Sequence, residues 1–276
     1  MLWFDGRWIA EGEAAIDPAD RGLLLADGLF ETMRAEAGQV RRLAAHLARL
    51  RQGASVLGLR VPLDDAALGD ALAATLAANG LDRAGAALRL TLTRGPGPRG
   101  LLPPEPASPT LMIAAFPLPP PRPPADAVLV ESVRRNEHSP TSRLKTLAYL
   151  DQVLALREAR AAGGDEAILR CTAGRLACAS AANLFLVIDG QARTPPVEDG
   201  ALPGVTRRRL LAIGPAAGTA VTASPLPGEA LQAAAEAFVT SSLAGIRPIR
   251  TLSGRSLPAP GPLTERLAAL LAADNE

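Results

Sequence analysis

One lysine stands out in a chain that otherwise carries its positive charge on arginine. The 276 residues include 29 lysines and arginines, and Lys145 is the single lysine among them. Arginine keeps its proton at accessible pH, whereas a lysine amine can be tuned to a neutral nucleophile that forms an imine with an aldehyde. The alternative is a leftover surface residue. The setting of Lys145, between the turn at 139–142 and a strongly periodic helical stretch, favours imine chemistry, because such a turn commonly presents a reactive side chain.

Composition argues against several other chemistries. The two histidines, His46 and His138, are too few for a histidine-rich metal cluster or a zinc protease site, so no metal is expected. The two cysteines are too few for a disulfide scaffold or a thiolate zinc site, which favours a reduced, cytoplasmic setting. A net charge of +1 argues against nucleic-acid binding. No apolar run approaches about 18 residues, and the first residues show no apolar signal core, so neither a membrane span nor a signal peptide is expected.

The elements that must position Lys145 alternate between short strands and helices. Hairpin chemistry at Asp5-Gly6 predicts strands at 2–4 and 7–9. Apolar residues at helical spacing predict helices at 44–57, at 64–79, and as one long helix over 139–164. Further strands are expected at 23–35, 87–95, 111–116, 127–133, 166–171, 176–180, 183–189, 191–195 and 237–249, with helices at 202–214 and from Leu231.

A proline-rich stretch is the clearest boundary in the chain. Residues 117–126 (PLPPPRPPAD) favour an extended, semi-rigid linker. They separate an N-terminal α/β domain, 1–116, from a C-terminal domain, 127–276. Strands and helices mixed around antiparallel hairpins predict an α/β or α+β enzyme of two domains.

Four blocks of sequence resemble a known family. They are residues 20–50 (DRGLLLADGLFETMRAEAG…RLAAHLARL), 142–159 (SRLKTLAYLDQVLALREA), 164–190 (GDEAILRCTAGRLACASAANLFLVIDG) and 194–211 (TPPVEDGALPGVTRRRLL). Together they resemble the class IV aminotransferases, the pyridoxal-phosphate enzymes of fold type IV. That family includes branched-chain and D-amino-acid aminotransferases, (R)-amine transaminases and aminodeoxychorismate lyase. The resemblance runs in order over nearly the whole chain and implies a two-domain fold type IV structure like that of D-amino-acid aminotransferase.

The resemblance implies a pyridoxal 5′-phosphate cofactor, bound by the C-terminal domain 127–276, and a role for each matching residue. Lys145 would form the internal aldimine, a Schiff base with the cofactor, and then act as the general base for the substrate α-proton. Tyr149, the single tyrosine, matches a residue that hydrogen-bonds the phenolic oxygen of the cofactor; a core aromatic on a helix is the alternative. The implied phosphate-binding residues are Arg49, Gly204, Val205, Thr206, Thr240, Ser241 and Ser242. The alternative for Gly204–Thr206 is a plain helix start, and the alternative for Thr240–Ser242 is a solvated turn.

Cys178 departs from the family pattern. In the family, a glutamate five residues before the Asn-Leu-Phe block pairs with the pyridine nitrogen and keeps it protonated. Counting back five positions from Asn183 reaches Cys178. A thiol is a weak partner unless it is ionised, so the ring is expected to withdraw electrons less strongly. We favour an enzyme with an unprotonated or thiolate-paired pyridine; entry of another acid, and low or altered activity, are the two alternatives.

The candidate substrate contacts give conflicting signals about the branch of the family. Arg94 and Arg99, in TRGPGPRGL, lie on a loop and can clamp a carboxylate, with a solvated loop charge as the alternative for Arg99. This motif and Thr32, in LFET, resemble the lyase branch. Leu101, however, stands where the lyase often has a tyrosine, and Tyr149 points to the branched-chain type.

These observations predict an aminotransferase that exchanges an amino group between an amino acid or amine and a 2-oxo acid. The resemblance also implies a homodimer, and we expect it to be cytoplasmic, without nucleic-acid or membrane partners. The first alternative is aminodeoxychorismate lyase, which releases pyruvate and 4-aminobenzoate. The second is a catalytically silent binding protein on the same fold, which fits the missing glutamate but leaves the lone lysine unexplained. Substrate and stereochemical preference stay open at this point.

Overall fold

The chain divides into two compact units. The computed structural model describes residues 1–10 and 12–274. The first unit comprises Met1–Pro120 together with Lys145–Ala148, and the second comprises Pro121–Leu144 and the chain from Tyr149 onward. The division between Pro120 and Pro121 falls inside the proline-rich segment. The short stretch that carries the lone lysine therefore lies with the first unit, although the residues on both sides of it belong to the second.

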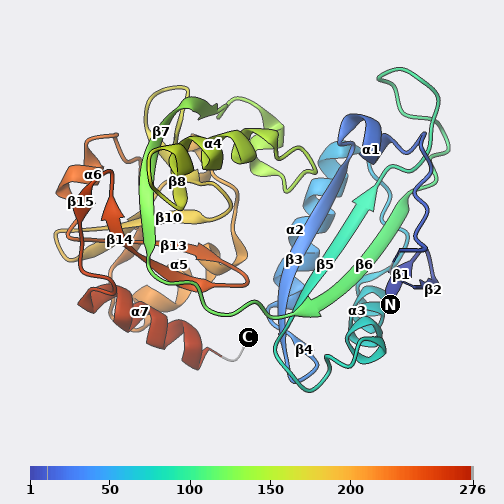
Figure 1. Ribbon diagram of the computed structural model, residues 1–276, viewed down its shortest axis with the longest axis horizontal. Helices are drawn as coiled ribbons and strands as arrows, with labels where there is room; N and C mark the ends of the chain where they lie inside the picture. Colours follow the sequence, from blue (N-terminus) through green and yellow to red (C-terminus); the bar gives the residue numbers. More distant parts are fainter. Residues whose placement is uncertain (11, 275–276) are drawn as a thin grey trace. The chain divides into compact units, whose positions relative to one another are not determined.

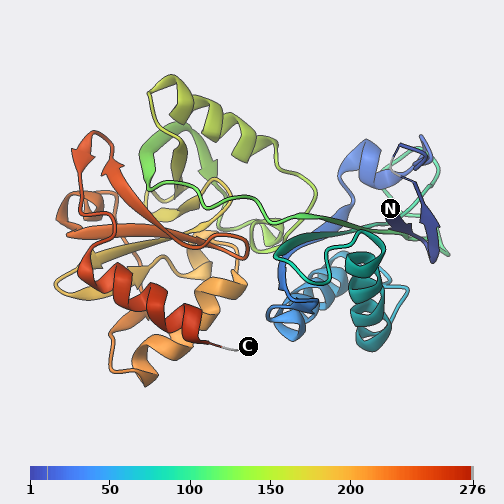
Figure 2. The ribbon, with the colours of Figure 1, turned by 60° about the horizontal axis from the view of Figure 1, so that its bottom comes forward.

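The first unit is an antiparallel sheet with helices on one face. The sheet runs in the order β2-β1-β6-β5-β3-β4. Helix α2 packs on β3 and helix α3 on β6, and Figure 2 shows both helices against the same face of the sheet. The elements are β1 (Leu2–Phe4), β2 (Arg7–Ile9), α1 (Arg21–Leu25), β3 (Gly28–Glu36), β4 (Gln39–Val40), α2 (Leu43–Leu57), α3 (Asp65–Ala78), β5 (Ala86–Thr93) and β6 (Thr110–Pro117).

The main strands and helices predicted for this unit are confirmed, although the strand expected over 87–95 ends at Thr93 and the short strand β4 was not predicted. The largest difference lies before β3. The expected strand over 23–35 was wrong at its start, because Leu23–Leu25 form the end of helix α1 and remain exposed. Asp20 begins this helix, since its side chain accepts a hydrogen bond from the Gly22 amide. Ala26 ends it in the left-handed conformation. The three leucines resemble part of a buried strand, but the cap at Asp20 makes them the end of a short helix instead.

The second unit is a mixed sheet with helices on both faces (Figure 1). Its strands run in the order β12-β11-β10-β13-β14-β7-β8-β9, with β15 paired to β14. Helix α4 packs on β7 and β8, whereas α5 and α7 pack on β13 and β14. The elements are β7 (Ala125–Arg135), η1 (Pro140–Arg143), α4 (Leu150–Ala161), β8 (Glu166–Cys171), β9 (Leu176–Ala179), β10 (Asn183–Ile188), β11 (Gln191–Thr194), η2 (Val197–Asp199), α5 (Val205–Ala216), β12 (Val221–Ala223), α6 (Ala230–Ala233), β13 (Glu236–Ser241), β14 (Gly245–Leu252), β15 (Arg255–Ser256) and α7 (Pro262–Ala273).

Three expectations for this unit need correction. The long helix over 139–164 is broken: a short 3₁₀ turn ends at Arg143, and α4 begins at Leu150. The strand expected over 237–249 is a hairpin, because Ser241 pairs with Gly245 and Gly245 takes a positive φ of 63°. Helix α7 was not expected. Its apolar residues Leu267 and Leu271 join the core beside the stacked rings of β10 and β13.

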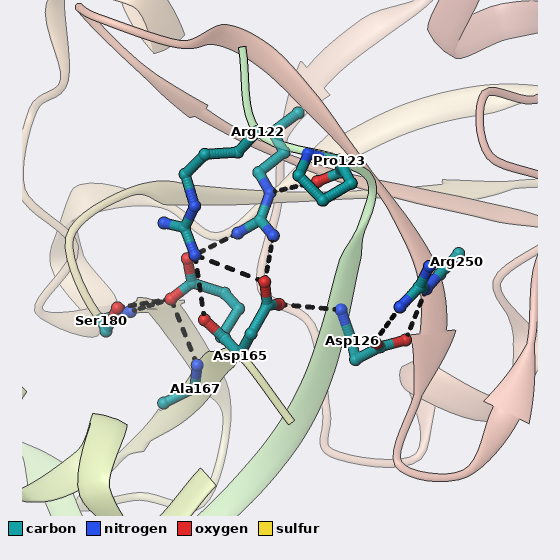
Figure 3. A network of polar contacts seen from close by, with 9 residues as sticks. Arg122, Pro123, Asp126, Asp165, Ala167, Ser180 and Arg250 are labelled. Carbon is teal, nitrogen blue, oxygen red and sulfur yellow. Dashed lines mark hydrogen bonds and ion pairs between the residues drawn. The ribbon is translucent and has the colours of Figure 1, made fainter. Parts of the chain in front are cut away.

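The end of the proline-rich segment is fastened to the second unit by a network of ion pairs (Figure 3). The buried Arg247 on β14 donates to the Pro123 carbonyl at 2.8 Å and pairs with the Asp165 carboxylate. Asp165 also accepts from the Asp126 amide at 2.9 Å, and the Asp126 carboxylate pairs with Arg250. Strand β7 therefore starts from a fixed point beside β8 and β14, whatever freedom the preceding prolines keep.

None of the helices formed by residues 1–10 and 12–274 combines the length and the apolar character needed to cross a bilayer.

Candidate functional site

The main chain around Lys145 pairs with the first residues of β3. The Phe30 amide donates to the Lys145 carbonyl at 2.9 Å, and the Leu147 amide donates to the Gly28 carbonyl at 3.1 Å. These bonds make 145–147 a short antiparallel addition to β3. Gly28 permits the close approach, because a Cβ there would lie 2.8 Å from the Leu147 side chain and 2.5 Å from the Leu92 carbonyl oxygen.

The Lys145 amine lies over an aromatic ring that it shares with another cation. Its Nζ is 4.2 Å from the centroid of the Phe30 ring, and the guanidinium carbon of Arg89 is 3.4 Å from the same centroid. Arg89 on β5 is the register partner of Thr32 on β3, so both positions belong to the same part of the sheet. Two positive side chains thus lie over one ring, and the charge of Arg89 disfavours the protonated form of the lysine.

The pKa of Lys145 is lowered to about 8 from an ordinary value of 10.5. Burial is the largest cause, because it disfavours the charged amine. The positive charges of Arg49 and Arg89 lower the pKa further, and the Glu31 carboxylate partly opposes them. At pH 7 about a tenth of the amine is then neutral, far more than for an ordinary lysine. The neutral amine is the form that attacks an aldehyde or accepts a proton.

A buried carboxylate organises the helix side of β3. Glu31 is fully buried and accepts from Arg49 Nε at 2.8 Å, from Arg49 Nη2 at 2.6 Å and from His46 Nδ1 at 2.7 Å. Burial would raise the pKa of Glu31, but the bonds from His46 and Arg49 outweigh it and lower the pKa. Burial lowers the pKa of His46, so its neutral ring donates to the carboxylate through Nδ1–H. His46 and Arg49 lie three residues apart on α2 and therefore face Glu31 together.

The second unit brings the two expected phosphate loops together. Helix α5 begins after Gly204, which makes no side-chain cap, and a Cβ at Gly204 would lie 1.9 Å from Asn183 Oδ1. Asn183 on β10 is the register partner of Thr240 on β13, so the start of α5 and the end of β13 meet at the start of β10. Among the described residues, the buried Thr240 Oγ1 is one of the hydroxyls without a hydrogen-bond partner.

This corner has the features of an anion site. The uncapped N-terminus of α5 offers amides, and the buried Thr206 lies in its first turn. Ser241 ends β13, and its Oγ accepts from the Ala244 amide at 3.2 Å. Ser242 and Val205 are the neighbouring members of the expected set, Ser242 in the turn after β13 and Val205 buried at the start of α5.

Cys178 lies on β9, buried to 8% exposure. Burial raises the pKa of its thiol to about 11, against a smaller opposing effect of the Arg135 charge. The thiol is therefore neutral at physiological pH. The sequence left two states open, an unprotonated pyridine and a pyridine paired with a thiolate. This environment is less compatible with the thiolate.

The remaining expected residues are placed as follows. Arg94 is buried and donates to the Asp27 carboxylate at 2.7 and 3.0 Å and to the carbonyls of Leu57 and Gly58. This placement favours a positioning role over direct contact with substrate. Arg99 is exposed on the loop between β5 and β6, and Tyr149 is half-buried at the residue before α4.

Sequence reasoning missed the polar partners of this site. Glu31 is a charged residue inside an otherwise apolar strand, which is a signal for a buried ion pair. The spacing of His46 and Arg49 on one helix was a second signal. The placement of Arg89 and Phe30 beside Lys145 had no local signal, because it depends on pairing between distant segments. In the described part of the chain, no group of three or more histidine, cysteine or acidic side chains is arranged to hold a metal ion.

Comparison with known proteins identifies the class that this fold and site define. Residues 28–252 match the family described as "Amino-transferase class IV". The match covers well over half of the chain, so the chain belongs to the class IV aminotransferases. These enzymes depend on pyridoxal phosphate, and the predicted family, fold type and cofactor are confirmed.

Particular relatives fall in more than one branch. A putative branched-chain-amino-acid aminotransferase of Methanocaldococcus jannaschii is 34% identical over 256 residues, covering 92% of this chain and 88% of the relative. The D-alanine aminotransferase of Bacillus licheniformis is 28% identical, covering 97% and 94%. The aminodeoxychorismate lyase of Bacillus subtilis is 29% identical, covering 90% and 85%. The solved branched-chain aminotransferase of Thermoproteus uzoniensis has a TM-score of 0.91 at 32% identity, covering 99% and 95%.

The lowered pKa of Lys145 predicts the pH dependence of aldehyde capture. With cofactor-free protein and pyridoxal, the rate should rise with pH, reach half of its maximum near pH 8, where half of the amine is neutral, and level off at higher pH. An ordinary lysine would still be gaining reactivity toward pH 10.5. The measurement is the rate of appearance of the visible absorbance band, and Lys145→Arg is the control that should give no band.

Arg49→Gln should move this profile to higher pH, because it removes a positive charge that lowers the lysine pKa. Pyridoxal lacks the phosphate, so any loss of phosphate binding does not affect this comparison. Arg49→Lys keeps the charge and should leave the midpoint close to that of the parent protein. A parent profile with its midpoint near 10.5 would contradict the environment described for Lys145.

Proposed function

We propose that this chain transfers an amino group between an amino acid or amine and a 2-oxo acid, with Lys145 as its catalytic residue. The observation that carries the proposal is the Lys145 amine held beside β3, with its pKa lowered to about 8, in a chain of the class IV aminotransferases. The pyridoxal phosphate used by this family supplies, when bound, an aldehyde for the lysine and a ring that draws electrons from the substrate α-carbon.

The residues present suit the two ends of that cofactor. The neutral Lys145 amine suits the aldehyde, and the uncapped start of α5 with its neighbouring hydroxyls suits a phosphate dianion. We assign the phosphate to Arg49, to Gly204–Thr206 and to Ser241–Ser242. Arg49 brings a guanidinium already oriented by Glu31. Tyr149 is assigned to the phenolic oxygen, by its place in the family motif.

Lys145 also fits the proton transfer. Its Nζ, once neutral, can accept the proton from the α-carbon of the substrate. It can then donate that proton to the carbon that carried the aldehyde of the cofactor. The nearby positive charges of Arg49 and Arg89 favour early release of that proton, since they lower the pKa of the same amine. Substrate carboxylate binding is assigned to Arg99, with Thr32 on β3 as a second candidate contact.

The direct test is an absorbance titration of the purified protein. Addition of L-amino acids, D-amino acids and (R)-amines in turn should abolish the visible band for one class, and a 2-oxo acid should restore it. Lys145→Ala should lack both the band and the response. The responding class gives the stereochemical preference, which the relatives leave divided between branched-chain and D-alanine aminotransferases.

Lyase chemistry is the second candidate, because an aminodeoxychorismate lyase is among the relatives. Incubation with aminodeoxychorismate distinguishes the two activities. Release of pyruvate and 4-aminobenzoate without an amino acceptor, combined with no response to any amino donor, would overturn the aminotransferase proposal.

We infer that Cys178 meets the pyridine nitrogen as a neutral thiol and leaves the nitrogen unprotonated. Cys178→Glu should then shift the visible band and raise turnover by about tenfold or more, since a protonated ring stabilises the developing negative charge better. Cys178→Ser, a neutral substitution of similar size, should change both little. If the glutamate variant keeps the parent spectrum and turnover, Cys178 does not contact the ring.

The homodimer and the cytoplasmic setting also belong to this proposal. Exposed apolar side chains support self-association: Leu23, Leu24, Leu25, Leu101 and Leu102 in the first unit, and Leu150, Val153 and Leu154 in the second. Sedimentation at micromolar concentration should give twice the chain mass of 28.5 kDa. A mass of one chain would exclude the dimer.

A further inference from the structure

The Asp20-Arg21-Gly22 motif lies outside the residues assigned to cofactor and substrate, yet its arginine makes an unusual set of hydrogen bonds. The Arg21 guanidinium donates to three consecutive carbonyls, those of Gly100 at 2.9 Å, Leu101 at 2.7 Å and Leu102 at 3.4 Å. Arg21 itself is 4% exposed. A buried guanidinium therefore binds residues 100–102, the outer part of the loop between β5 and β6. This loop has little regular secondary structure of its own.

The charge of Arg21 is balanced on the inner side. Its Nε donates to Asp27 Oδ2 at 2.9 Å. Arg94, at the base of the same loop, binds both oxygens of Asp27. Burial would raise the pKa of Asp27, but the bonds from Arg94 and Arg21 outweigh it and lower the pKa. The Asp27 carboxylate thus links Arg94, at the base of the loop, to Arg21, which binds the outer part of the loop.

The other two residues of the motif, Asp20 and Gly22, contact the strand ends that flank the same loop. The Asp20 carboxylate accepts from the hydroxyls of Thr93 and Thr110, the residues that flank the loop on β5 and β6, each at 2.9 Å. A Cβ at Gly22 would lie 2.3 Å from Thr93 Cγ2, so the glycine lets α1 approach β5. The Arg21 amide also donates to the Gly95 carbonyl at 3.0 Å.

The held segment carries the residue assigned to the substrate carboxylate. Arg99 directly precedes the three carbonyls, while Leu101 and Leu102 are 84% and 85% exposed. Within a single chain, apolar packing therefore does little to order this part of the loop, and the hydrogen bonds to Arg21 must offset the conformational entropy that its order costs. Lysine at position 21 would not suffice, because a single ammonium cannot reproduce a planar fork aimed at three acceptors.

We propose that Arg21 is a positioning residue, which holds residues 99–102 so that Arg99 is preorganised to bind the carboxylate of the substrate. The proposal rests on the proposed function of Arg99. Removing Arg21 leaves Asp27 paired with Arg94, so the substitution does not bury an uncompensated carboxylate. Its effect should therefore concentrate on the loop.

The test uses the cofactor-loaded enzyme with Arg21→Gln and Arg21→Lys. Trypsin cleavage after Arg99 should accelerate about tenfold or more in both, because cleavage requires a locally opened loop. For the amino donor identified by titration, KM should rise about tenfold with kcat nearly kept, since bound substrate orders the loop once it is in place. Arg60→Gln, at an exposed position at the end of the turn after α2, is the matched control and should change neither measurement.

An intact visible band and an unchanged thermal midpoint, within a few degrees, show that a variant is folded, and the conservative Arg21→Lys protein keeps the test open if Arg21→Gln does not fold. Unchanged cleavage after Arg99 in a folded variant would overturn the proposal. Faster cleavage without a change in KM would overturn it as well, since loop order would then not serve binding. Arg99→Gln separates the two levels. If it leaves KM unchanged, the assignment of Arg99 has failed; if it raises KM and Arg21→Gln does not, the positioning inference has failed.

Discussion

The site depends first on a short piece of main-chain pairing. Two hydrogen bonds join the segment of Lys145 to the start of β3, although about 115 residues separate them along the chain. The paired segment lies between the 3₁₀ turn that ends at Arg143 and the start of α4 at Leu150, and residues 145–148 belong to the first unit. It also places the amine over the Phe30 ring, where burial, and then the charges of Arg49 and Arg89, lower the pKa of the lysine. Without the pairing, Lys145 would be an ordinary surface cation.

Charge is arranged in opposite ways on the two faces of β3. On the helix face, Glu31 is fully paired, so the positive charge of Arg49 is fixed in place and His46 stays neutral. On the other face, Lys145 and Arg89 share an aromatic ring in place of a carboxylate. A paired carboxylate stabilises a cation, whereas burial and a second cation nearby disfavour one. The alternation of side chains along a single strand is what separates these environments by one residue.

The chain combines family features with a local departure. The amine and the anion corner at the start of α5 agree with membership of the class IV aminotransferases. Cys178, a buried thiol, stands at the sequence position where the family resemblance predicts a carboxylate. The Asp20-Arg21-Gly22 motif lies outside this chemistry and acts on a loop instead. Similarity over nearly the whole chain therefore establishes the reaction class, while the relatives, which include aminotransferases and a lyase, leave the substrate to be decided by a few side chains.

The sequence by itself determined the lone lysine, the motif order, the fold type and the elements with strong local signals, such as α2, α3 and the first hairpin. These depend on periodicity, caps and turns, which act over a few residues. Only the tertiary structure decided that 145–147 join β3, that Glu31 pairs with Arg49 and His46, and that Arg21 holds the loop of Arg99. Each of these joins segments far apart in the chain. Their free energy comes from burial and hydrogen bonds that exist only once the sheet has formed, so no local pattern records them.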